Sequence, residues 1–393
     1  MKNQKSYHEL SEFFYGFVKW IVRSCKECGV DQLYFFTREG EFFKKIYDQI
    51  KYYEPELATI SAVNVLEVSR LATFAASLRN VEPEEFQRMW SQYNEQTLRT
   101  FFLSLGMEVD EFLPVIKKYN ISVDEIIVNP IYDKRMRSLI ADNLIKDALL
   151  TNAQSKKKIL TQYCREHGIK DGTQVAIVDI GWRGTIQDNL CLTLPHVVWR
   201  GYYLCLAPYL NEQPLNGSKK SFLNLNESKV VLRYPTPIEM ICNSPNGSVV
   251  GYECIDGKIA AVKNISTKEN DVYYFYTSNF QRKILEYIPR LVSSKNINTK
   301  KNALKTFLMY PPKEAAKNYF KLQHNESFGN GAFINKSVSV HWWLFLFASV
   351  SHNARIELKE ELSKTTWPQG YMVRSRLKWL VYIYNYILEK KYL

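Results

Sequence analysis

The sequence predicts an α/β protein built on a parallel sheet, with a helical insertion and a mainly helical C-terminal part. Short apolar runs typical of buried strands alternate with longer stretches of helical periodicity, as in parallel sheets with crossover helices. Hydrophobic residues make up 46% and charged residues 23% of the 393 residues. This composition indicates a folded globular chain and excludes a disordered protein, a collagen-like repeat and a disulfide-rich miniprotein.

The first part of the chain is expected to contain two helices and two strands. Apolar side chains recur at helical spacing from Tyr7 to Cys28, and Gly29 offers a natural stop. The compact apolar run Leu33 to Phe36 predicts a strand, followed by a polar turn and a second helix. A further strand is predicted over Val63 to Val68. The mostly helical pattern that follows predicts an insertion over about 71–170.

The clearest buried strand in the sequence is predicted over Gln174–Asp179, with a short helix at 186–190 and a fourth strand over 197–206. Polar composition predicts an exposed loop over 211–228, and an Asp-Gly pair at 256–257 predicts a hairpin. Beyond Asn264 the chain has helical spacing, with breaks at Pro311-Pro312 and at 367–370. We place a domain boundary near residue 262, between an α/β core (1–262) and a helical region (263–393).

The charge balance predicts an anionic partner. Lys and Arg number 52 against 40 Asp and Glu, for a net charge of +12, which suits phosphates, nucleic acid or an acidic membrane face. The longest apolar stretch, 338–350, is shorter than a membrane span, and seven cysteines without framework spacing favour a reducing compartment. We expect a cytoplasmic protein. The stretch 374–391 is interpreted as a packed helix, with peripheral contact to the inner face of the cytoplasmic membrane as the alternative.

The strongest local motif is a glycine turn between the third predicted strand and its helix. Glycines let backbone N–H groups approach an anion, and a helix N-terminus adds a favourable dipole. Asp179, at the predicted strand end, could accept hydrogen bonds from sugar hydroxyls or hold a metal-bound water. The alternative is a tight turn with Asp179 as the N-cap. The motif reads Asp179-Ile180-Gly181-Trp182-Arg183-Gly184-Thr185.

Two further polar turns follow predicted strands and offer cations for anion binding. The first comprises Thr37, Arg38, Glu39 and Gly40, and the second comprises Ser69 and Arg70. Each arginine alone is more often a solvated loop residue. Because the carboxyl ends of parallel strands meet at one edge of a sheet, the three turns together predict one crevice for a substrate with two separated phosphates.

These motifs resemble type I phosphoribosyltransferases, in a divergent branch from bacterial polysaccharide (ribofuranose-adding) clusters that is often described as haloacid-dehalogenase-like hydrolases. The resemblance implies a phosphoribosyltransferase-like (Rossmann-like) sheet. It also implies transfer of 5-phosphoribose from phosphoribosyl pyrophosphate to a glycan hydroxyl, with a partner phosphatase that removes the 5-phosphate. It rests on Phe36-Thr37-Arg38-Glu39-Gly40, Val68-Ser69-Arg70, Val178-Asp179-Ile180-Gly181-Trp182, Glu239 with Pro245-x-Gly247-Ser248, and Trp367-Pro368-Gln369-Gly370.

The resemblance also implies roles for individual residues. Arg183, Gly184 and Thr185 would cradle the 5-phosphate, and Asp179 would face the ribose hydroxyls. Gly181 and Trp182 belong to the same predicted site for the 5-phosphate and ribose. Thr37 to Gly40 with Ser69 and Arg70 would hold the pyrophosphate. Asp179 and Glu39 would assist electrostatically, and Glu239 would serve as the base. Mg²⁺ would be bound through the substrate, with no direct protein ligands.

Other functions remain open at this stage. The enzyme alternative is a sugar-phosphate hydrolase or a nucleotide-sugar glycosyltransferase, although the chain lacks the Asp-x-Asp strand end of a dehalogenase-type phosphatase. The non-enzymatic alternative is a nucleic-acid-binding or scaffold protein that uses the positive charge. Under the favoured interpretation the acceptor is lipid-linked or an oligosaccharide, and no nucleic acid is expected.

Overall fold

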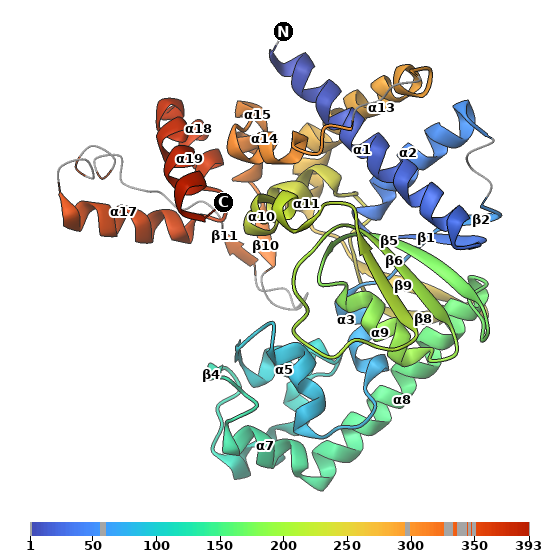
Figure 1. The fold of residues 1–393 in the computed structure, drawn as a ribbon. Helices are drawn as coiled ribbons and strands as arrows, with labels where there is room; N and C mark the ends of the chain where they lie inside the picture. Colours follow the sequence, from blue (N-terminus) through green and yellow to red (C-terminus); the bar gives the residue numbers. More distant parts are fainter. Residues whose placement is uncertain are drawn as a thin grey trace.

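A five-stranded parallel sheet forms the centre of the molecule in the computed structural model (Figure 1), which describes residues 2–55, 60–294, 299–325, 333–335, 344, 347 and 351–392. Its strands lie in the order β2-β1-β5-β6-β7, and every pairing in it is parallel. The predicted α/β class with a parallel sheet is therefore confirmed. The strands are β1 (Gln32–Phe36), β2 (Ala62–Leu66), β5 (Gln174–Trp182), β6 (Val198–Leu206) and β7 (Gly217–Ser221).

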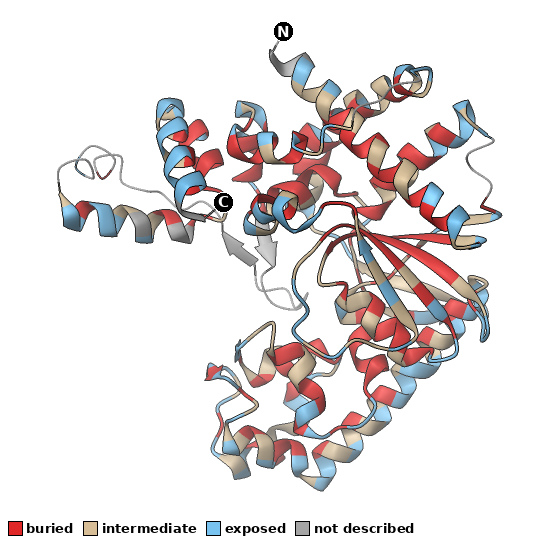
Figure 2. Cartoon of the chain, in the orientation of Figure 1, coloured by how far each residue is buried: buried red, intermediate tan, exposed pale blue. Residues whose placement is uncertain are grey.

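Helices cover both faces of this sheet. On one face lie α1 (Lys2–Glu27) and α2 (Gly40–Tyr53), and on the other lie α8 (Asn143–Glu166) and α9 (Thr185–Thr193) (Figure 1). Side chains of β1 alternate between the two faces: Leu33 and Phe35 join the core beneath α1 and α2, whereas Tyr34 joins the core beneath α8 and α9. This period of two explains why the strand is apolar throughout. Figure 2 shows the buried strands between the two helical layers.

The predicted helical insertion lies between β2 and β5 and has a hydrophobic core of its own, which includes Phe86, Trp90 and Phe101. It also contains a short antiparallel pair, β3 (Glu95–Gln96) and β4 (Ile127–Val128), that the sequence did not predict. In Figure 1 the insertion extends below the sheet. Its helices are α3 (Arg70–Phe74), α4 (Gln87–Trp90), α5 (Leu98–Ser104), α6 (Leu113–Ile116), α7 (Lys134–Ala141) and α8.

The prediction of an exposed loop over 211–228 is wrong. That segment contains β7 and the start of α10 (Leu225–Arg233), which is followed by α11 (Thr236–Cys242). Strand β7 reads Gly-Ser-Lys-Lys-Ser and pairs only with β6 among the described residues. An edge strand of this kind needs little apolar surface, so it gives no hydrophobic signal. The predicted hairpin is confirmed as β8 (Ser248–Ile255) and β9 (Lys258–Asn264).

The region beyond residue 264 is mainly helical, as predicted, and α14 and α18 adjoin the predicted proline breaks. Its core is continuous with that of the sheet, because Phe280, Phe307 and Trp367 belong to the same cluster as Phe14 and Phe35. The domain division near 262 stays a prediction. The described elements are α12 (Thr267–Val272), a π-helical turn (Tyr273–Thr277), α13 (Ser278–Val292), α14 (Ala303–Met309), α15 (Lys313–Tyr319), β10 (Gln323–Asn325), β11 (Phe333–Asn335), α17 (His352–Lys364), α18 (Pro368–Arg374) and α19 (Lys378–Tyr392).

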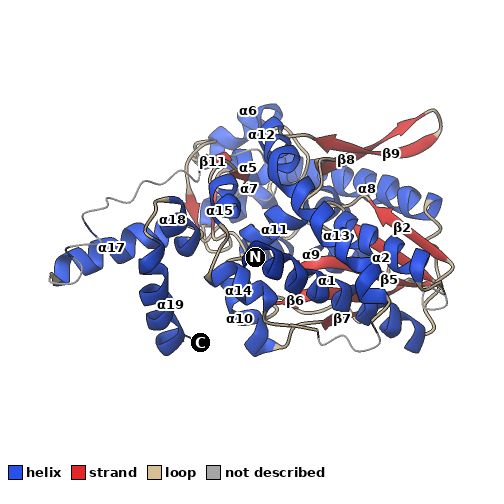
Figure 3. Ribbon diagram, turned by 90° about the horizontal axis from the view of Figure 1, so that it is seen from above, coloured by secondary structure: helices blue, strands red, loops and turns tan. Residues whose placement is uncertain are grey.

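Seen from above, α17 to α19 lie at one end of the molecule, away from the sheet (Figure 3). Most of the apolar stretch 338–350 lies outside the described residues. Among the helices that are described, none combines the length and the apolar character needed to cross a bilayer.

Candidate functional site

The three polar turns predicted to bind anions follow three neighbouring strands of the sheet. Thr37 to Gly40 follow β1, Ser69 and Arg70 come shortly after β2, and the glycine turn ends β5; β1 lies between β2 and β5. Because these strands are parallel, their turns share one edge. From β1 the chain continues to β2 on one side, and it later returns to β5 on the other side of β1. The strand order therefore reverses between β1 and β5, and ligands of α/β proteins bind at such a topological switch point.

Strand β5 is longer than predicted, and this changes the position of Asp179. The strand continues to Trp182, and Asp179 pairs with Tyr203 of β6, whereas the pairing of β5 with β1 ends at Val178. Asp179 therefore lies one residue past the last pair of β1 and β5, level with Phe36 at the end of β1 and near the Thr37 to Gly40 turn. It is not the N-cap of α9, a position that Gly184 takes. Its Oδ1 accepts a hydrogen bond of 2.8 Å from the N–H of Ile180.

The geometry of the glycine turn requires two of its glycines. Gly181 has φ of +125°, and a Cβ there would come within 1.9 Å of the carbonyl oxygen of Cys205 on β6. Gly184 has φ of +67°, and a Cβ would meet the hydroxyl of Tyr203 at 2.8 Å. Because the backbone of the turn passes so close to β6, a residue larger than glycine fits neither position.

Carboxylates from distant elements meet next to the first turn. Glu39 precedes α2, Asp179 lies on β5, and Glu239 lies on α11 and accepts a hydrogen bond of 2.7 Å from Nε1 of Trp182. Arg38 lies among them: its Nη1 donates to Glu269 of α12 at 2.6 Å, and its Nη2 lies 3.8 Å from Glu39. The guanidinium of Arg38 is thus already paired with protein carboxylates.

The protonation equilibria of these carboxyl groups are shifted by their surroundings. Burial raises the pKa of Asp179 to about 7, and the charge of Glu39 adds to the increase, while Arg70 opposes it. Burial also raises the pKa of Glu39; Arg38 opposes this shift and Glu239 adds to it. Perturbed pairs of this kind gather where proton transfer or charge stabilisation takes place.

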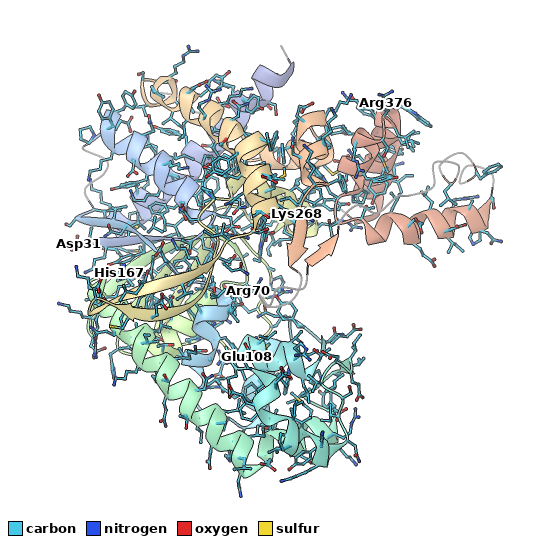
Figure 4. The ribbon with its side chains drawn as sticks, turned by 180° about the vertical axis from the view of Figure 1, so that it is seen from behind. Asp31, Arg70, Glu108, His167, Lys268 and Arg376 are labelled. Atoms are coloured by element: carbon cyan, nitrogen blue, oxygen red, sulfur yellow. The ribbon has the colours of Figure 1, made fainter. Side chains whose placement is uncertain are left out.

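A segment of the helical insertion connects the second turn with the third. Arg70 donates to the hydroxyl of Tyr93 at 2.6 Å, and its guanidinium lies over the Tyr93 ring. The adjacent Gln92 donates to Oγ1 of Thr185 at 3.1 Å. Figure 4 shows Arg70 near the centre of the molecule, between the insertion and α12, on which Lys268 is labelled. Arg70 is exposed, so part of its donor set faces solvent.

The third turn is supported from behind by Lys219 of β7. The side chain of Lys219 is only 5% exposed and forms an ion pair of 2.6 Å with Asp188 of α9. Its Nζ also donates to the carbonyl oxygen of Arg183 at 3.0 Å, which ties the turn to the sheet edge. Lys219 and Asp188 line a cavity of about 120 Å³. Within the described chain, Nε of Arg183 is buried without a hydrogen-bond partner.

Two hydroxyls of the predicted pyrophosphate site bind the protein itself. Oγ1 of Thr37 donates to the carbonyl oxygen of Val68 at 3.0 Å and accepts from the N–H of Val68 at 3.2 Å. Oγ of Ser69 donates to Val249 at 2.6 Å and accepts from Ala72 at 3.0 Å. Both side chains therefore fix the positions of the turns.

Sequence reasoning missed three residues that shape the site: Tyr93, Lys219 and Glu269. A helix-capping pattern could have drawn attention to Glu269, because Ser266 accepts a hydrogen bond from the N–H of Glu269. Nothing in the local sequence around Tyr93 or Lys219 indicates their contacts. Both residues contact partners that are distant in the sequence and that come close only when the chain folds.

Among the described residues, no group of three or more His, Cys, Asp or Glu side chains is arranged to hold a metal ion. Comparison of the chain with models of protein families gives no match, and comparison with curated proteins gives none either.

Proposed function

We propose that this protein is a phosphoribosyltransferase of the glycosyltransferase type, which moves 5-phosphoribose from phosphoribosyl pyrophosphate to a glycan hydroxyl in bacterial surface polysaccharide synthesis. The observation that carries the proposal is the meeting of three polar turns at one sheet edge, with Asp179 between cationic and carboxylate groups. A donor with a phosphate at one end and a pyrophosphate at the other carries two separate groups of negative charge, and each could bind a different polar turn. The proposed sheet class is phosphoribosyltransferase-like.

The proposed roles follow from which groups remain available. The guanidinium of Arg183 and the Gly184 to Thr185 helix start would hold the 5-phosphate. Arg70 would contact the pyrophosphate as the exposed cation of the second turn. Because Arg38 is paired with Glu39 and Glu269, it would support this turn and contribute positive potential.

In the proposed reaction, the bond between the anomeric carbon and the pyrophosphate oxygen breaks. The acceptor oxygen bonds to the anomeric carbon, and its proton passes to Asp179. A pKa of about 7 suits that transfer. Glu239, the base that the resemblance implies, accepts a hydrogen bond from Trp182 and would instead hold the turn. Glu39 would stabilise the positive charge that grows on the ribose.

Mg²⁺ is the proposed cofactor, held chiefly by substrate oxygens, and it would neutralise the departing pyrophosphate. No group of described carboxylates is arranged to hold the ion directly, so the substrate would supply its ligands. The acceptor would be a lipid-linked or oligosaccharide glycan, a partner phosphatase would remove the 5-phosphate, and the protein would work in the cytoplasm at the membrane's inner face.

A melting experiment tests the proposal. We expect Mg²⁺ with phosphoribosyl pyrophosphate to raise the melting temperature, since a ligand at 100 times its Kd stabilises a protein by about 2.7 kcal/mol. UDP-glucose and UDP-galactose serve as matched controls and should cause no shift. Mass spectrometry of an oligosaccharide acceptor should then show the added phosphoribosyl group. A shift with the nucleotide sugars alone, or transfer that survives Asp179→Ala, contradicts the proposal.

A further inference from the structure

Helix α19 carries apolar side chains on opposite faces, although only one face is packed. Val381 and Leu388 are buried in the main hydrophobic core. A second row, spaced three and four residues apart, remains open to solvent: Trp379, Tyr382, Ile383, Tyr386 and Ile387 are 56%, 58%, 51%, 59% and 53% exposed. A helix that is apolar all round is expected in a core or in a membrane environment. Figure 2 shows the exposed residues along α19.

The exposed row forms a continuous patch with one neighbour. Tyr310, which follows α14, is 46% exposed, and its ring centroid lies 5.4 Å from that of Tyr382. Aromatic residues in this arrangement keep each other in place at the surface. Contiguous apolar patches on a protein surface mark sites of interaction.

Basic residues lie just before α19 and at both of its ends. Arg374, Arg376, Lys378 and Lys390 are all exposed, and Nζ of Lys390 lies 4.6 Å from the centre of the Tyr386 ring. The nearby acidic residue, Glu389, forms an ion pair with Lys305 at 2.8 Å. Trp and Tyr beside basic residues are the composition of helices that lie in the interface of an anionic bilayer.

We propose that this α19 face, defined by Trp379, Tyr382, Ile383, Tyr386 and Ile387, binds the surface of an anionic lipid bilayer. The charges favour lipid over a second copy of the chain, because an isologous dimer through this face would bring its basic residues together. Acidic headgroups instead complement them, at about 1 kcal/mol per basic residue, equivalent to roughly fivefold in affinity. The inference does not depend on the transfer reaction.

Helix α19 lies away from the candidate site. Figure 3 places α19 at the end of the molecule opposite the hairpin β8–β9. In Figure 4, Arg376, which precedes α19, is far from Arg70 of the second turn. Binding through the α19 face therefore anchors the protein while the sheet edge stays accessible.

Vesicle flotation with the full chain tests the inference. The wild-type protein should float with vesicles of equimolar phosphatidylcholine and phosphatidylglycerol, bind phosphatidylcholine vesicles at least tenfold more weakly, and dissociate as salt is added. Trp379→Asp with Ile383→Asp should abolish flotation. Lys378→Gln with Lys390→Gln should weaken it by roughly fivefold for each lysine.

The matched control is Ile126→Asp with Tyr132→Asp, which changes two side chains in the insertion that are 63% and 81% exposed. This pair should float like the wild type, and all variants should keep the wild-type circular dichroism spectrum and melting temperature. The inference is overturned if the wild type stays unbound, or if the Trp379 and Ile383 variant floats equally well. It is also overturned if that variant only abolishes self-association measured by sedimentation velocity.

Discussion

The turn after β1 and the turn after β5 have similar sequences of glycine, arginine and a helix start, yet the fold gives them different surroundings. In the first, Arg38 is paired with Glu39 and Glu269, and Thr37 is bonded to Val68. In the turn after β5, Nε of Arg183 is buried and has no hydrogen-bond partner among the described residues. Folding therefore decides which of the two arginines is already paired with protein carboxylates. The local motif alone does not reveal this.

The two turns also differ in how much space their backbones leave for a side chain at glycine. Gly181 has a positive φ and lies against β6, whereas Gly40 begins α2 and a Cβ there would come no closer than 3.0 Å to Phe35. The turn after β1 is held mainly by side chains, and the turn after β5 is held mainly by its backbone and Lys219. Substitutions in the two turns should therefore have different consequences.

Gly181→Ala should cause the largest effect. The new Cβ would overlap the carbonyl oxygen of Cys205 in a backbone conformation that alanine rarely adopts. Strain and overpacking together should cost about 5 kcal/mol of unfolding free energy. Gly40→Ala is the matched control and should cost about 1 kcal/mol. Urea denaturation measures both, and equal losses would show that the two turns do not differ in backbone demand.

Arg38→Met and Arg183→Met should separate the roles of the two turns. Arg38→Met leaves buried carboxylates without their cation and should reduce the unfolding free energy by about 3 kcal/mol. Arg183→Met should cost less than about 1 kcal/mol, since its Nε makes no hydrogen bond. It should instead weaken phosphoribosyl pyrophosphate binding by about 2 kcal/mol, measured by calorimetry. If Arg38→Met weakened phosphoribosyl pyrophosphate binding and Arg183→Met reduced stability, the roles proposed for the two arginines would be exchanged.

The smallest expected effect concerns pH. The pKa of Asp179 is about 7 in the folded protein, above its ordinary value near 3.8, so the folded state binds the proton more tightly. The stability that this proton adds is complete below the ordinary pKa and is lost as pH rises through about 7. Between about pH 5 and pH 8, the wild type should lose roughly 2–4 °C more in melting temperature than Asp179→Asn. Parallel pH profiles would mean that the Asp179 carboxyl group is already ionised at low pH.

Local patterns predicted much of the fold. Apolar runs located β1, β2, β5 and β6 to within a few residues. The signal is clearest for β1 and β5, which are buried and therefore apolar on both faces. The hairpin turn at Asp256-Gly257 and the helix break at Pro311-Pro312 followed from backbone preferences. These features depend on neighbours in the chain, which a sequence displays directly.

The sequence by itself determined that polar turns would follow buried parallel strands, because strand periodicity and turn chemistry are local properties. Only the tertiary structure decided which groups in those turns remain available. Arg38 is paired by Glu269, which lies 231 residues away, and Arg70 and Thr185 are contacted from the insertion by Tyr93 and Gln92. Whether a charge is paired depends on partners that are distant in the chain, and folding alone brings such partners together.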